Sequence, residues 1–152
     1  MSKMVQAFLS GVFFTFILDF FIFLTIQQNY IIPYEIDVYY NILFVDNQNI
    51  FLFIFLSLIF GYMIIYIENK ISLIVLTILS FVVALSLFIP SFGKFIGSSL
   101  LMQKNQLLTY KSYKYNGDIL YNGRKNISFY DYKLKKVIIL QKKSTIIIKG
   151  EN

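Results

Sequence analysis

The chain has 152 residues, of which 57% are hydrophobic and 14% charged, a composition more apolar than that of soluble domains. It contains no His, Cys or Trp, which excludes thiol nucleophiles, histidine acid–base catalysis and the commonest ligands of metals and haem. Residues 101–152 carry eleven bases and three acids, whereas residues 1–100 carry three bases and five acids. We therefore expect an integral membrane protein with a spanning region in 1–100 and a small basic β-rich extramembrane module in 101–152.

The first apolar run covers residues 5–26. Its length is enough to cross a hydrocarbon core of about 30 Å at about 1.5 Å per residue. A cleaved signal peptide is the alternative interpretation. The run is long, however, contains Asp19 and is followed by no small-residue cleavage motif, so we expect it to remain as a spanning helix.

The segment between the first two apolar runs, residues 27–49, carries the signals of a helix that lies on the membrane surface. Pro33 suits the first turn of such a helix, and Glu35 and Asp37 suit its positive end. Apolar side chains recur at helical spacing, at Ile36, Tyr39, Tyr40, Leu43 and Phe44. We therefore expect an amphipathic interfacial helix that begins near Pro33.

Two further apolar runs, residues 50–67 and 71–89, are almost free of polar interruptions and predict the second and third spanning helices. Only the short segment "ENK" separates them, which predicts a tight antiparallel hairpin. After Pro90, the sequence is typical of a chain leaving the membrane surface.

From Leu107 onward, short β-type segments alternate with turn residues. The pairs Asn116-Gly117 and Asn122-Gly123 each predict a two-residue hairpin turn, and the whole predicts a β-meander of four or five strands. About fifty residues rarely bury enough surface to be stable alone. We therefore expect this module to be supported by the membrane, by a second copy or by a partner.

Small and polar residues form one stripe on each predicted span. They are Gly11, Thr15 and Asp19 on the first, Ser57 and Gly61 on the second, and Thr77, Ser80 and Ala84 on the third. Such stripes let helix backbones approach closely in a membrane. Packing among the three helices is the favoured interpretation, and docking of another subunit is the alternative.

Asp19 is the one charged residue within the three apolar runs. A carboxylate at mid-membrane costs about 2.5 to 3.5 kcal/mol and usually faces a bundle interior or a water-filled cavity. Counting residues places Asp19 level with Ser57 and close to the depth of Ser80, with Thr15 one turn away. We expect a structural hydrogen bond to one of these serines, and an ion or proton site is the alternative.

The stretch "YKSYKY", Tyr110 to Tyr115, interleaves tyrosines with bases. Lys111, Tyr113 and Lys114 suit contact with anionic lipid headgroups or with a partner, and on a membrane-tethered chain we favour this over nucleic-acid binding. We find no phosphate-binding glycine loop or paired catalytic carboxylates, and we expect no cofactor, no bound metal and no enzymatic activity.

Orientation and function follow from these features. Lys3 and Lys70 on one side of the membrane balance Lys94 and Lys104 on the other, but the first loop has no base, so we expect a cytoplasmic N-terminus and an external module. The sequence favours a non-enzymatic accessory, assembly or scaffold subunit of a bacterial cytoplasmic-membrane complex. Its expected partners are lipids and another protein or a second copy, but not nucleic acid. The alternative is an ion- or proton-linked transport component that uses Asp19.

Overall fold

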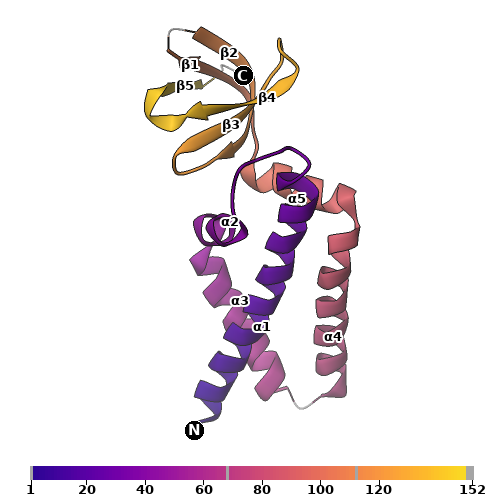
Figure 1. The fold of residues 1–152 in the computed structure, drawn as a ribbon. Coiled ribbons are helices and arrows are strands. Elements are labelled where there is room, and N and C mark those ends of the chain that lie inside the picture. The colour runs from indigo at the N-terminus through magenta and orange to yellow at the C-terminus, as the bar shows by residue number, and fades with distance from the viewer. Residues whose placement is uncertain (1, 68, 112, 150–152) are drawn as a thin grey trace.

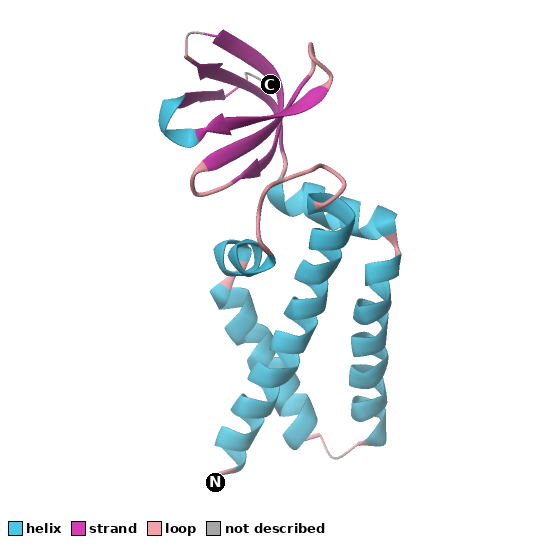
Figure 2. Ribbon diagram, viewed as in Figure 1, coloured by secondary structure: helices cyan, strands magenta, loops and turns pink. Residues whose placement is uncertain are grey.

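The computed structural model describes residues 2–67, 69–111 and 113–149, with the side chains of 147–149 outside the description. Helices form one end of the molecule and a five-stranded sheet forms the other (Figures 1 and 2). The helices come first in the chain, and the sheet is C-terminal. The predicted order of a helical region followed by a β-rich module is confirmed.

The helical region contains five α-helices within the described residues. They are α1 (Lys3–Ile26), α2 (Tyr40–Asn47), α3 (Ile50–Ile65), α4 (Lys70–Leu85) and α5 (Pro90–Leu101). The π-helical turn η1 (Gln27–Ile31) continues α1, and the 3₁₀ turn η2 (Ser86–Phe88) continues α4.

Two helices, Lys3–Ile31 and Lys70–Phe88, are long and apolar enough to cross a membrane. A third candidate is the pair α2 and α3, which passes the same test only if the two helices count as one span, although they meet at 85°. Between α3 and α4, residue 68 of the predicted "ENK" loop lies outside the described residues. The Ser72 hydroxyl donates to the Met63 carbonyl, 3.0 Å away, which fastens the start of α4 to the end of α3.

The helix that we expected on the membrane surface begins later than predicted. Residues 32–35 form a turn in which Glu35 has a φ of 53°, and α2 starts at Tyr40. The expectation of a helix starting at Pro33 is wrong because Pro33 terminates the long first helix instead. Proline has no N–H to continue the helical hydrogen-bond ladder, so the chain turns there before α2.

The sheet contains β1 (Gln103–Tyr110), β2 (Tyr113–Asn122), β3 (Asn126–Asp131), β4 (Lys136–Gln141) and β5 (Thr145–Lys149). All recorded pairings are antiparallel, in the order β4-β3-β2-β1-β5. The first four strands form the predicted meander, and β5 returns to pair with β1.

The sheet curls because a short connection joins its two edge strands. β4 and β5 lie at opposite edges, yet only the three residues of the 3₁₀ turn η3 (Lys142–Ser144) connect them. Five flat strands would place their edges about 19 Å apart, whereas a three-residue 3₁₀ turn advances about 6 Å. The sheet therefore bends toward a barrel around a small apolar core, which consists of Leu108, Ile119, Ile127, Phe129 and Leu140.

Only one of the two predicted Asn-Gly turns lies at a turn. Asn116 and Gly117 are inside β2, where Gly117 pairs with Gln106 and Asp131. A Cβ on Gly117 would lie 1.8 Å from the Tyr130 carbonyl oxygen, so this glycine permits close strand approach. Asn122, in contrast, ends β2, and the Gly123 N–H donates to the Asn126 carbonyl in the turn that follows.

A second and larger core joins the sheet to the helices. The buried Tyr30 hydroxyl of η1 donates to the Leu120 carbonyl of β2, 2.9 Å away. Around this bond, the buried cluster consists of Phe23, Ile26, Tyr30, Ile31, Ile36, Leu43, Leu101, Leu120 and Tyr121. The small β-module is therefore supported by the helices of its own chain.

Candidate functional site

The stripes of the first two predicted spans meet where α1 crosses α3. A Cβ on Gly11 would lie 1.8 Å from the Ser57 carbonyl oxygen, and one on Gly61 would lie 2.1 Å from that of Ala7. Thr15 and Ser57 are fully buried. Because these backbones are in direct contact, the two small-residue faces are occupied within the chain.

The third stripe, on α4, is more open. Thr77 is exposed, whereas Ser80 and Ala84 are half-buried. The Thr77 and Ser80 hydroxyls donate to carbonyls one turn earlier in α4, at Leu73 and Leu76. Such bonds within a helix satisfy the hydroxyl groups without a partner on another helix.

Asp19 has a different partner from the one predicted. Its Oδ2 accepts a hydrogen bond from Gln48 Nε2 at 3.0 Å, and Gln48 lies at the junction of α2 and α3. The predicted bonds to Ser57 or Ser80 are absent among the described residues, because the Ser57 hydroxyl donates to Phe53 within α3 and the Ser80 hydroxyl donates within α4.

The error came from the depth at which α1 and α3 were aligned. The prediction placed Asp19 beside Ser57, but Gly11 lies there. Eight residues separate Gly11 from Asp19, which is about 12 Å along a helix. Asp19 therefore lies beyond the start of α3 at Ile50 and next to the polar residues of the α2–α3 junction. It does not lie beside the centre of α3.

The sequence analysis missed a group of contacts at the C-terminal end of α1 and in η1. The Thr25 and Ser86 hydroxyls are 3.0 Å apart, and Asn29 Nδ2 donates to the Leu87 carbonyl. On α5, Gly93 and Gly97 pack so closely on η1 that an added Cβ would lie 2.4 Å from side-chain atoms of Asn29 and Tyr30. The Gly-x₃-Gly spacing of residues 93–97 was the available signal.

An ion pair fastens the β2–β3 turn to α2. The Arg124 guanidinium donates through Nε to the Asp46 carboxylate, 2.8 Å from Oδ2, and through Nη2 to Oδ1. Hydrogen bonding from Arg124 lowers the pKa of the Asp46 carboxyl, and the same bond raises the pKa of Arg124. Beside this pair, burial raises the pKa of the Tyr121 hydroxyl.

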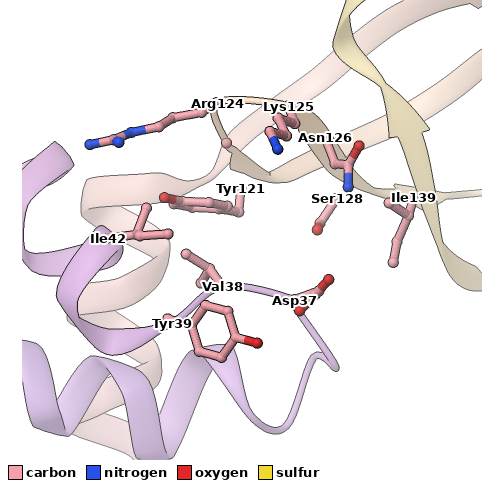
Figure 3. A pocket seen from close by; sticks show the side chains of 11 residues that line it. Asp37, Val38, Tyr39, Ile42, Tyr121, Arg124, Lys125, Asn126, Ser128 and Ile139 are labelled. Atoms are coloured by element: carbon pink, nitrogen blue, oxygen red, sulfur yellow. The ribbon is translucent and has the colours of Figure 1, made fainter.

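A cavity of about 400 Å³ lies between the start of α2 and the sheet (Figure 3). One wall is the segment 37–42, and the other comes from β2, the β2–β3 turn, β3 and β4. It is lined by Asp37, Val38, Tyr39, Ile42, Tyr121, Gly123, Arg124, Lys125, Asn126, Ser128 and Ile139. A neighbouring cavity of about 300 Å³ shares Arg124, Lys125 and Asn126 and adds Gln141 and Lys143.

The residues predicted to contact lipid or a partner lie apart from this cavity. Lys111, Tyr113 and Lys114 are exposed at the β1–β2 end of the sheet, which Figure 1 shows far from the helices. Lys111 Nζ lies 5.3 Å from the centre of the Tyr110 ring. Two other bases, Arg124 and Lys125, line the cavity beside α2, and no motif in the sequence singles them out.

Within the described residues, no group of three or more His, Cys, Asp or Glu side chains could hold a metal ion. The chain matches no known family model and has no significant similarity to curated proteins or to solved structures. Inference about function therefore depends on the geometry of the chain itself.

Proposed function

We propose that the protein is a multi-pass membrane protein and acts as a non-enzymatic accessory, assembly or scaffold subunit of a bacterial cytoplasmic-membrane complex. In this proposal α1, α3 and α4 cross the membrane, α2 lies at its outer surface and the sheet stands outside. The observation that carries it is the buried core shared by the ends of the helices and the sheet. This core holds the sheet at a fixed position above the helices, as a docking platform requires.

The helix lengths support this placement. The segment Lys70–Phe88 has 19 residues, or about 28 Å of helix, close to the hydrocarbon thickness of about 30 Å. The Phe20 ring of α1 packs on Tyr40 of α2, with their centres 5.6 Å apart, and Phe20 is about 25 Å along the helix from Lys3. α2 therefore lies close to one membrane thickness from the start of α1.

The surface left unoccupied supports a partner-binding role. The small-residue faces of α1 and α3 are used inside the chain, so another subunit would dock on α4 or on the sheet. α4 is held near both ends by hydrogen bonds. At its start the Ser72 hydroxyl donates to the Met63 carbonyl, and just after its end the Ser86 hydroxyl of η2 bonds to that of Thr25. Between these points its exposed side chains include Thr77 and Phe81, and they face lipid or a partner.

Asp19 has a structural role in this proposal. Its partner is the uncharged Gln48, and the bond joins α1 to the junction of α2 and α3. A transport role would require Asp19 to exchange an ion or a proton, and an Asn in its place would abolish that exchange while still accepting a hydrogen bond.

Gentle detergent extraction of the tagged protein from its native membrane, followed by native mass measurement, tests the proposal. We expect a complex of defined mass that contains the chain and at least one further subunit or a second copy. A chain that extracts as a folded monomer with nothing bound, under conditions that preserve other complexes of the same membrane, would contradict a subunit role.

A further inference from the structure

The cavity beside α2 has an unusual distribution of charge. Lys125 lies on the sheet side with its ammonium group turned into the space, and Asp37 lies on the opposite wall (Figure 3). The Arg124 guanidinium extends away along α2, where Asp46 neutralises it. Asn126 and the buried Ser128 add polar groups between the two charged walls.

Arg124–Asp46 is the only ion pair among the described residues. Lys125 and Asp37 are therefore farther apart than ion-pair distance. A simple anion bound to Lys125 would be repelled by Asp37, and a simple cation bound to Asp37 would be repelled by Lys125. A ligand that carries both charges satisfies both walls. Lys143 lines the neighbouring cavity together with Lys125, so a second base is available near the sheet side of the site.

We propose that this cavity binds a small zwitterion that carries a phosphate and a primary ammonium group, the chemistry of an ethanolamine phospholipid headgroup. Lys125, with Lys143 beside it, takes the phosphate through charge-assisted hydrogen bonds. Asp37 accepts from the ammonium group, and the Tyr39 ring, on the same wall as Asp37, offers it a cation–π contact.

The position of the cavity suits a lipid. One wall is the segment 37–42, which leads into α2 and which the proposed membrane placement puts at the outer surface, and Val38 and Ile42 line it with apolar side chains. Tyr39 is 75% exposed, and tyrosine is enriched at the headgroup level of membranes. The inference that the ligand is a membrane lipid rests on the proposed membrane placement. It does not depend on the existence of a partner subunit.

Binding is measured on the full chain in an uncharged maltoside detergent. Short-chain phosphatidylethanolamine, short-chain phosphatidylglycerol and free phosphoethanolamine are titrated separately, and thermal stabilisation gives each apparent Kd. We expect phosphatidylethanolamine to bind about tenfold more tightly than phosphatidylglycerol, which lacks the ammonium group. Binding of free phosphoethanolamine with similar affinity would support the chemistry and identify a soluble source, whereas binding of the lipid alone would identify the membrane.

Two variants assign the two ends of the ligand. Lys125→Gln with Lys143→Gln should weaken phosphatidylethanolamine binding by about tenfold or more. Asp37→Asn should remove the preference over phosphatidylglycerol. The matched control is Lys133→Gln with Lys135→Gln, which changes the charge equally at the β3–β4 turn, the opposite end of those strands.

Three results would overturn the proposal. The first is wild-type protein that binds phosphatidylglycerol as tightly as phosphatidylethanolamine. The second is a control variant that loses as much binding as the Lys125 and Lys143 variant, since this would reveal only general attraction to a basic surface. The third is no saturable stabilisation by any of the three ligands. Each variant is first checked for an unchanged circular dichroism spectrum, so that loss of binding is not loss of fold.

Discussion

At the scale of single residues, the crossing of α1 and α3 depends on two glycines. Gly11 and Gly61 let the backbones of the two helices touch. Close backbone contact of this kind is how helices associate where no hydrophobic effect acts between them. A side chain at Gly11 would overlap the Ser57 carbonyl, which is main chain and cannot rotate away. The helices would have to separate along the whole contact.

We therefore predict that Gly11→Ile destabilises the protein by at least about 3 kcal/mol, at the upper end of overpacking effects. Thermal unfolding in detergent measures the change. Thr77→Ile is the matched control, because it adds bulk to an exposed position of α4 and should leave the midpoint nearly unchanged. Equal effects of the two substitutions would show that α1 and α3 do not meet in this way.

The β3–β4 turn begins with a tyrosine, Tyr132, whose ionisation should lower the stability of the protein. The Tyr132 hydroxyl lies 2.5 Å from Asp118 Oδ1, and Asp118 also accepts from the Asn105 N–H at 2.9 Å. The hydrogen bond to Asp118 raises the pKa of Tyr132 above its ordinary value of 10.0. Asn105 has a φ of 53° where the β1–β2 register shifts, so this network fixes an irregular point of the sheet.

Because the folded pKa of Tyr132 exceeds the unfolded value, its contribution is complete below about pH 10 and is lost as pH rises through the folded pKa. Wild-type protein should therefore lose more unfolding free energy between about pH 8 and about pH 11 than Tyr132→Phe does. Denaturant unfolding at both pH values measures this. The other tyrosines titrate in both proteins, so only the difference between them reports on Tyr132, and identical losses would contradict the assignment.

At the scale of secondary-structure elements, Asp19 and Gln48 connect α1 to the bend between α2 and α3. The two helices meet at 85°, and the residues between them, Gln48 and Asn49, are polar. Asn49 caps α3 by accepting from the Leu52 N–H at 3.1 Å, and Gln48 bonds to Asp19. The bend is thus held from both sides by side-chain hydrogen bonds.

Asp19→Asn should preserve the bend, because an amide oxygen still accepts from Gln48, whereas Asp19→Leu should loosen it. Since the chain has no cysteine, spin labels can be placed at Phe13 and Val45, both exposed. We expect the distance distribution between the labels to be unchanged in Asp19→Asn and broader in Asp19→Leu. A distribution unaffected by Asp19→Leu would mean that this bond does not hold the bend.

The elements that sequence could predict are those with a strong local signal. Uninterrupted apolar runs indicated α1, α3 and α4, and short β-type segments indicated the sheet, because both patterns depend on nearby residues. Turn signals were less reliable. Asn116-Gly117 has the composition of a hairpin turn, but its glycine serves a close contact with Tyr130 in the middle of a strand, which only tertiary structure reveals.

The candidate site was less predictable for the same reason. Asp46 and Arg124 are 78 residues apart in sequence, and neither belongs to a motif. The depth at which α1 meets α3 is set by the contact between Gly11 and Gly61. Counting from the ends of the apolar runs missed this contact and placed Asp19 about 12 Å from its actual neighbours. Asp19 itself was identified by its chemistry, but its partner was not.

At the scale of the whole molecule, the helices and the sheet behave as one unit. The Tyr30–Leu120 bond, the Arg124–Asp46 pair and the shared core each join the two regions. The start of α2 and the β2–β3 turn must therefore lie on the same side of any membrane that the helices cross.

Thiol labelling of intact cells tests this placement and the orientation together. Single cysteines at Asn41 and Asn122, both exposed, should both react with a membrane-impermeant reagent if the module is external. The control is a cysteine at the exposed Lys70, which begins α4 at the end of the helices far from the sheet. It should react only after the cells are opened. Protection at Asn41 and Asn122 would reverse the orientation, and labelling at only one of them would contradict the shared core.

The length of the first helix gives this unit a mechanical property. Lys3–Ile31 has 29 residues, or about 43 Å, which exceeds a hydrocarbon thickness of about 30 Å, so in the proposed membrane placement it would tilt or protrude. Its last turn, η1, is also the part that bonds to β2. In that placement, a thinner bilayer that increased the tilt of α1 would rotate the sheet by the same angle, because the sheet is bonded to the end of this helix. We therefore expect bilayer thickness to set which face of the sheet is turned toward the membrane, and orientation measurements on α1 and on the sheet in short-chain and long-chain lipids should change together.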